Sequence, residues 1–242
     1  MTRTSARARN IDILIMLPTL LTAYLFSVLQ LTGIDDAISA WFYDPARHAF
    51  PLQNDFWLRD VLHDGGHDLM VSVLLGVFAI WLLSHLLKRL RPWRRTTAYL
   101  ALSMTLGALS VSVGKQISNT DCPWDLSAYG GSLPHVLLFE DKPDDLPRGR
   151  CFPGGHSSSG FALFGLYFVA VMRGARRAWP WLLPALLVGG TFSVAQWIRG
   201  AHFPSHDLIS AWLCWMAALL CHLLMTRSPA EPRNERPHPA RA

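Results

Sequence analysis

The chain has 242 residues and an excess of five positive charges at neutral pH. Apolar residues make up 51% of it and charged residues only 16%, whereas a soluble domain usually carries about 25% charged residues. Length and composition therefore favour one compact membrane bundle over soluble domains. Because basic residues stand beside apolar runs, as at 88–95, we attribute them to membrane topology and expect no nucleic-acid partner.

Six segments are long and apolar enough to span a bilayer, which takes about 20 residues. The first is too long for the apolar core of a signal peptide, so we interpret it as a retained span. The predicted spans are Ile11–Gly33, Met70–Leu87, Thr97–Val113, Ser157–Met172, Ala178–Ile198 and Leu208–Met225. They predict an all-α fold, a six-transmembrane-helix bundle forming a single domain over residues 1–226. The polar, Pro-rich tail at 227–242 is expected to be disordered.

The basic residues also predict the orientation. They are concentrated in the N-terminal segment, in the second-to-third and fourth-to-fifth connections, and in the C-terminal tail. Alternating spans put all four segments on one side, which the positive-inside rule makes the cytoplasm. Both termini are therefore expected there. The opposite side receives 34–68, 114–156 and 199–207, and the first of these is acidic and aromatic, as in an interfacial helix.

The unusual polar residues all lie in these outward segments. Gly154 and Gly155 allow close approach to a ligand, and a helix that starts after them directs free N–H groups at an anion such as phosphate. His156 at this position is suited to protonate a leaving group. A helix cap with an incidental histidine is the alternative. Lys115 at the end of the third span is suited to bind an anion or simply to extend towards the membrane surface.

A third polar group surrounds the junction of the fifth and sixth spans. Arg199 suits bidentate contact with phosphate oxygens. His202 and His206 are four residues apart, so they share a face if they are helical. The same spacing suits a metal pair, although no carboxylate or cysteine pattern of a known metal signature accompanies it. Ionisable residues at the membrane edge are candidates for function.

The three polar groups, in order and on one membrane face, resemble the type 2 phosphatidic acid phosphatase family. Its motifs are Lys-x6-Arg-Pro, Pro-Ser-Gly-His and Ser-Arg-x5-His-x3-Asp. The six-span plan fits this family as well. The matching residues are Lys115 and Pro123 in the first motif, Pro153, Gly155 and His156 in the second, and His202, in a Gly-Ala-His-Phe-Pro-Ser run, in the third.

Four positions depart from the family's pattern, and nearby residues are expected to compensate. The departures are Cys122 for Arg, Gly154 for Ser, Gln196 for Arg, and His206 for Asp. Arg199 follows Gln196 by three residues and would share its helix face. Asp207 is one residue beyond the family's aspartate. Arg150 or Arg148 would supply the charge that is missing at Cys122.

The resemblance implies a covalent mechanism. His202 attacks phosphorus to form a phosphohistidine, and His156 protonates the leaving oxygen and then activates water. Asp207 or His206 orients His202, with Gln196 as support. The expected phosphate-binding residues are Lys115, Gly154, Gly155, Ser157 and Arg199. No metal or other cofactor is expected.

The resemblance also implies a substrate class. We expect hydrolysis of a phosphomonoester or diphosphate of a membrane lipid, on the periplasmic side of a bacterial inner membrane. Phosphatidic acid, phosphatidylglycerophosphate, a polyprenyl diphosphate and a lipid A phosphate all qualify. A lipid-to-lipid phosphotransferase and a non-catalytic lipid transporter are the alternatives. Charges gathered at one face, rather than at mid-membrane, favour the enzyme over the transporter. The sequence indicates no protein partner.

The four cysteines fall into two pairs with different expected states. Cys214 and Cys221 lie in the sixth span, where a buried thiol behaves as a small apolar group. Cys122 and Cys151 lie in one outward connection, next to the first and second motifs. If these motifs meet around one phosphate, the two sulfurs come together, and the periplasm is oxidising. We therefore predict a Cys122–Cys151 disulfide.

Overall fold

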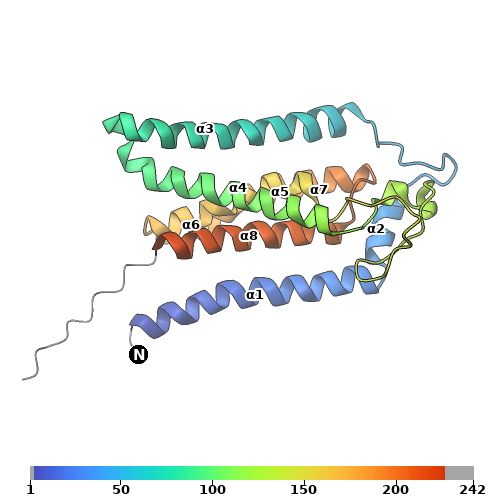
Figure 1. Cartoon of the computed structure of the whole chain (residues 1–242), viewed down its shortest axis with the longest axis horizontal. Helices are drawn as coiled ribbons and strands as arrows, with labels where there is room; N and C mark the ends of the chain where they lie inside the picture. The colour runs from blue at the N-terminus through green and yellow to red at the C-terminus, as the bar shows by residue number, and fades with distance from the viewer. Residues whose placement is uncertain (1–2, 227–242) are drawn as a thin grey trace, which may run out of the picture.

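The computed structural model describes residues 3–226, which form helices joined by loops (Figure 1). Over these residues the only β-structure is two isolated bridges, so the all-α prediction is confirmed. The α-helices are α1 (Arg3–Leu31), α2 (Ile34–Phe42), α3 (Gly66–Leu86), α4 (Arg94–Ile117), α5 (Gly155–Phe161), α6 (Gly165–Met172), α7 (Leu183–Ile198) and α8 (Pro204–Thr226). The tail at 227–242, predicted to be disordered, lies outside the described residues.

Six helical runs are long and apolar enough to cross a membrane, which confirms the predicted number and order. They are Ile11–Leu31, Trp57–Leu86, Lys88–Ile117, Gly155–Met172, Trp179–Ile198 and Pro204–Thr226. The predicted start of the second span at Met70 was wrong. A π-helical segment, η1 (Trp57–Gly65), runs directly into α3, so the helix begins 13 residues earlier. Because η1 contains polar side chains, including Asp60 and His63, hydropathy alone did not predict this extension.

The core of the bundle lies among α4, α5–α6, α7 and α8, while α1 and α3 flank it (Figure 1). Tyr99 of α4 is fully buried, and its hydroxyl donates to the Ala218 carbonyl of α8 (2.8 Å). Peripheral α1 is attached mainly to α8, through the indole of Trp215, which donates to the Leu14 carbonyl (2.9 Å). The remaining faces of α1 and α3 carry exposed apolar side chains, as expected of helices in contact with lipid.

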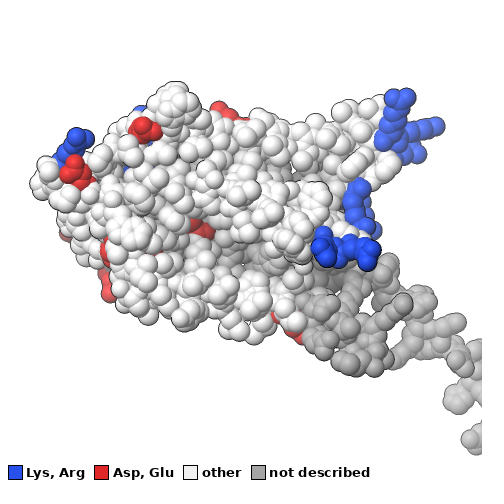
Figure 2. Space-filling model, turned by 180° about the vertical axis from the view of Figure 1, so that it is seen from behind, with Lys and Arg blue, Asp and Glu red and all other residues white. Residues whose placement is uncertain are grey.

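The polar segments of the three motifs lie at one end of the bundle and most of the basic residues at the other. Figure 2 shows Lys and Arg side chains gathered mainly at one end of the molecule. The α3–α4 connection (Lys88–Trp93) is at that end. The C-terminus of α4 and the N-termini of α5 and α8 are at the opposite end (Figure 1). There, buried Asp35 of α2 accepts the backbone N–H of Ser205 (3.0 Å), which fixes the start of α8.

Helices α5 and α7 approach each other closely because glycines face each other at their contact. A Cβ added to Gly160 would lie 2.5 Å from the backbone nitrogen of Gly189. A Cβ added to Gly189 would lie 2.3 Å from the ring of Phe161. Because α5 carries His156, this contact bears on the position of the site as well as on stability.

Gly189→Ala is therefore expected to destabilise the protein by roughly 1–3 kcal/mol, because the overpacked ring and backbone must shift. The matched control is Gly190→Ala, since nothing lies within 4 Å of a Cβ at Gly190 and alanine favours helix. Thermal unfolding of purified protein in detergent measures both. Equal midpoints for the two variants would contradict the close contact.

Candidate active site

Three segments that are distant in the sequence meet at the end of the bundle opposite the α3–α4 connection. Lys115 lies in the last turn of α4, His156 in the first turn of α5, and His202 in the turn between α7 and α8. His156 and His202 are buried, at 8% and 7% exposure. Lys115 and His156 lie near enough to His202 to interact with it electrostatically. The structure thus brings together the predicted nucleophile, acid and lysine.

The turn that carries His202 is held from two sides. Gly200 adopts a positive φ of 72°, and a Cβ there would lie 2.4 Å from the ring of Phe50, so only glycine fits. The Gly200 carbonyl accepts the backbone N–H of Trp124 (3.0 Å), which ties the turn to the segment after α4. His202 follows this turn, so its ring position is set by both contacts.

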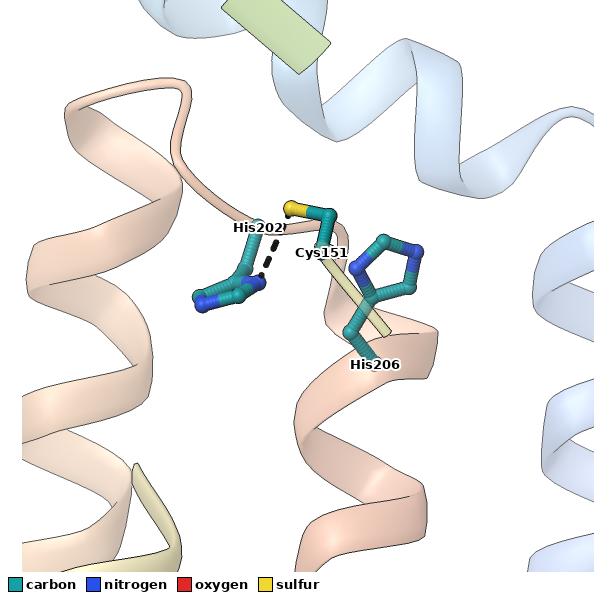
Figure 3. A group of neighbouring side chains, drawn as sticks. All are labelled: Cys151, His202 and His206. Carbon is teal, nitrogen blue, oxygen red and sulfur yellow. Dashed lines mark hydrogen bonds between the residues drawn. The ribbon is translucent and has the colours of Figure 1, made fainter. Parts of the chain in front are cut away.

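The disulfide predicted between Cys122 and Cys151 is confirmed, with the two Cα atoms 5.2 Å apart. It places the Cys151 sulfur 3.3 Å from Nδ1 of His202 (Figure 3). A disulfide sulfur carries no hydrogen, so in this contact Nδ1 is the donor and sulfur the weak acceptor. The neutral ring then has its lone pair on Nε2, which points away from Cys151 and His206 in Figure 3. This is the tautomer that a nucleophilic Nε2 requires.

Burial also sets the protonation of His202. Loss of water around the ring lowers its pKa well below the ordinary value, and the positive charge of Lys115 lowers it further. The imidazole is therefore neutral at physiological pH and its lone pair is available. Both causes follow from the location of the ring and need no additional base.

Asp207 lies elsewhere than expected. One carboxylate oxygen accepts the Ser157 hydroxyl (2.6 Å) and the other the indole N–H of Trp197 (2.7 Å). Both oxygens are thereby engaged away from His202, so the expectation that Asp207 orients the nucleophile is not supported. A Cβ at Gly154 would lie 1.8 Å from an Asp207 oxygen. Glycine in place of the family's serine therefore makes the space that the shifted aspartate occupies.

The expected phosphate-binding groups of the second motif are corrected in two details. The hydroxyl of Ser157 is fully buried and donates to Asp207, so it is not free to bind phosphate. The backbone N–H of Gly154 donates to the His206 carbonyl (3.1 Å) and is likewise engaged. Gly155 lies against the lysine, since a Cβ there would be 2.8 Å from Cε of Lys115. Glycine at 155 thus allows the lysine to reach the site.

Lys115 and Arg199 bring positive charge close to His202 and His156. Nζ of Lys115 donates to the Arg150 carbonyl (3.1 Å), while the Arg150 side chain itself is exposed. Arg199 is 7% exposed and donates from Nη1 to the Gln196 side-chain oxygen (3.2 Å). It also interacts electrostatically with His156. Arg199 and the buried, neutral Gln196 are thus direct neighbours, and the replacement of one by the other in phosphate binding stays a prediction.

Sequence reasoning missed the contribution of the segment before α3. Nε2 of His156 donates to the Leu62 carbonyl (3.0 Å), because a carbonyl can only accept, and Nε of Arg199 donates to the Gln53 carbonyl (2.9 Å). The ring of His63 lies 4.6 Å from that of His156. Backbone carbonyls leave no signal in a sequence, although the charged run of η1 would have drawn attention to His63.

One group of side chains has the arrangement of a metal site. Donor atoms of Cys151, His202 and His206 lie within 4.8 Å of one another, and all three residues are buried (Figure 3). The Cys151 sulfur is bonded to Cys122, however, and only a thiolate is a strong ligand. In the disulfide form the group therefore offers two imidazoles at most.

A histidine NMR titration checks the protonation of His202. We expect its ring to stay neutral as the pH falls through about 6.5, the ordinary histidine value, because burial and Lys115 disfavour the cation. The resonance is identified by its loss in His202→Gln, and that variant serves as the control. A ring that titrates at or above 6.5 would contradict the assignment.

Comparison with known proteins adds the family. No curated protein and no solved structure matches the chain. A family model of the PAP2 superfamily matches residues 96–229, more than half of the chain and a range that contains Lys115, His156 and His202. Members of this superfamily are phosphatases that act on phosphate esters. The chain belongs to the PAP2 superfamily.

Proposed function

We propose that the protein is an integral membrane phosphatase that hydrolyses a lipid phosphate through a phosphohistidine on His202. The observation that carries this proposal is the state of His202: a buried, neutral ring whose Nδ1 contacts the Cys151 sulfur and whose Nε2 is directed elsewhere. A covalent route needs a side chain with a free lone pair and cations close by. Lys115 interacts electrostatically with His202, and Arg199 with His156.

In the proposed first step, Nε2 of His202 attacks phosphorus and the P–O bond to the leaving oxygen breaks. Protonated His156 gives its proton to that oxygen. In the second step a water molecule loses a proton to His156, its oxygen attacks phosphorus, and the N–P bond breaks to release inorganic phosphate. Lys115, Arg199 and the Gly155 backbone N–H hold the equatorial oxygens, where charge is concentrated. Asp207 positions α5 through Ser157 and takes no part in the proton transfers.

An apolar groove beside the site supports a lipid substrate. It has a volume of about 200 Å³ and reaches from Lys115 and Gly155 down between α3 and α4. Most of its wall is apolar, formed by Met70, Val71, Leu74, Met104, Ala108, Val111 and Ala162, and its polar side chains are those of His67, Ser112, Ser158 and Ser159 besides Lys115. If the phosphate of a lipid binds at Lys115, the hydrocarbon chain of the same lipid would lie in this groove. A small soluble phosphate ester would leave this groove empty.

The charge distribution supports an orientation. Under the positive-inside rule the basic end of Figure 2 faces the cytoplasm. We propose that both termini lie there, that residues 1–226 form one domain, and that the site faces the periplasm from a bacterial inner membrane. A disulfide beside the site suits that oxidising compartment.

His202→Ala is expected to lower phosphate release from lipid phosphates by roughly a thousandfold or more, because it removes the nucleophile. The control is His85→Ala, which removes an exposed histidine in the last turn of α3, at the other end of the bundle. Purified variants are assayed on a panel of phosphatidic acid, phosphatidylglycerophosphate, polyprenyl diphosphate and lipid A. If His202→Ala retains near wild-type turnover on the panel, the assignment is wrong.

Ala108→Phe tests the groove. The added ring should raise KM roughly tenfold for long-chain lipid phosphates, because it occupies the space of the chain, and leave p-nitrophenyl phosphate hydrolysis nearly unchanged. The matched control is Leu109→Phe, whose position is exposed and lies outside the groove. A lipid KM that does not change in Ala108→Phe, or changes equally in both variants, would exclude this path for the chain.

A further inference from the structure

The arrangement around the Cys151 sulfur suggests a second state of the site. We propose that reduction of the Cys122–Cys151 disulfide creates a zinc site formed by Cys151, His202 and His206, and that zinc bound there inactivates the enzyme. The binding site follows from the geometry alone. The inactivation rests, in addition, on the proposed role of His202 as nucleophile.

The distances suit a tetrahedral ion. The Cys151 sulfur is 3.3 Å from Nδ1 of His202, and donor atoms of all three residues lie within 4.8 Å of one another. With Zn–S near 2.3 Å and Zn–N near 2.0–2.1 Å, two ligand atoms of a tetrahedral zinc ion are about 3.5 Å apart. Small rotations of the side chains therefore bring the three donors onto one ion. A water molecule completes the four ligands, as in open zinc sites.

His206 provides an independent observation. Its side chain is 1% exposed, and its Nδ1 has no hydrogen-bond partner among the residues that the structure describes. In Figure 3 the ring nitrogen nearest Cys151 and His202 is directed towards them. A buried polar atom without a partner is uncommon in proteins, and a ligand is one explanation for it. His206 also replaces the family's aspartate, so this donor is a feature of this chain.

The redox step balances with a dithiol as reductant. Cys122 is partly exposed whereas Cys151 is fully buried, so the attacking thiolate reaches the Cys122 sulfur. The S–S bond breaks and its electron pair leaves with Cys151 as a thiolate. The second thiol of the reductant then displaces Cys122 and closes the reductant into a cyclic disulfide. Zinc binds the Cys151 thiolate and the lone pairs of two neutral imidazoles without further electron transfer.

Coordination would stop the proposed reaction for a specific reason. A neutral imidazole has one lone pair, and zinc on Nδ1 of His202 uses it. The ring proton must then sit on Nε2, which can no longer attack phosphorus. The disulfide form favours the opposite tautomer, since the Cys151 sulfur can only accept a hydrogen bond from Nδ1. The two states of Cys151 thus select opposite nitrogens of His202.

The test uses the full chain in detergent and two single variants that need no reductant. Cys122→Ala leaves the Cys151 thiol free, whereas Cys151→Ala leaves only Cys122. After equilibration with zinc chloride and desalting, we expect one zinc per chain in Cys122→Ala and none in Cys151→Ala or in oxidised wild-type protein. Cobalt in place of zinc should give thiolate-to-cobalt charge-transfer absorption in Cys122→Ala alone. Equal metal content in the two variants, or none in folded Cys122→Ala, overturns the site.

Two further measurements keep the outcomes separate. If Cys122→Ala does not fold, wild-type protein reduced after folding is compared with oxidised protein, and no difference in bound zinc overturns the site. Phosphate release by zinc-loaded Cys122→Ala should fall at least a hundredfold and return with EDTA, while oxidised wild-type protein responds to neither. Zinc bound with full turnover contradicts the role of His202 and leaves the site standing. A protein that hydrolyses lipid phosphate but binds no zinc refutes this inference alone.

Discussion

The Cys122–Cys151 disulfide joins the segment after α4 to the segment before α5, and its sulfur contacts the ring of His202. Closing a loop of 29 residues in sequence contributes about 3–4 kcal/mol in the chain-entropy model. The more important consequence is local. The bond joins the first motif to the second, and its Cys151 sulfur contacts Nδ1 of His202 in the third. Hydrogen bonds join the same three segments, from the Trp124 N–H to the Gly200 carbonyl and from the Gly154 N–H to the His206 carbonyl, and the disulfide adds a covalent link to them.

The departures from the family's motifs are explained as replacements that act together. Cys122 stands where the family has an arginine, and it forms the disulfide with Cys151. Gly154 gives up a serine hydroxyl and makes room for the carboxylate of Asp207. Gln196 gives up a second arginine and accepts a hydrogen bond from Arg199. These changes leave Lys115, Arg199, His156 and His202 at the site, which are the groups that the proposed phosphoryl transfer uses.

Much of the fold and of the candidate site could be predicted from the sequence, because membrane spans and motif spacing are local patterns. The six spans, the disulfide and the pairing of Arg199 with Gln196 follow from hydropathy, cysteine position and helical spacing. The prediction of where the second span starts was wrong because η1 is helical although it is polar. The hydrogen bonds of Asp207 were not predicted, because a shift of one residue turns a helical side chain by about 100°. The position of Asp207 in the motif did not show that its carboxylate would contact Ser157 and Trp197. The carbonyls of Gln53 and Leu62 contact Arg199 and His156 through backbone atoms, which carry no sequence signal.

The central claim is that phosphate passes through His202. The most direct measurement is rapid quenching of the purified protein with a ³²P-labelled lipid phosphate, followed by peptide mapping under alkaline conditions that preserve phosphohistidine. We expect acid-labile label on the peptide that contains His202, which disappears during a chase with unlabelled substrate and is absent from His202→Ala. Label on any other residue, or product formation with no enzyme-bound phosphate at any time in the first turnover, would contradict it.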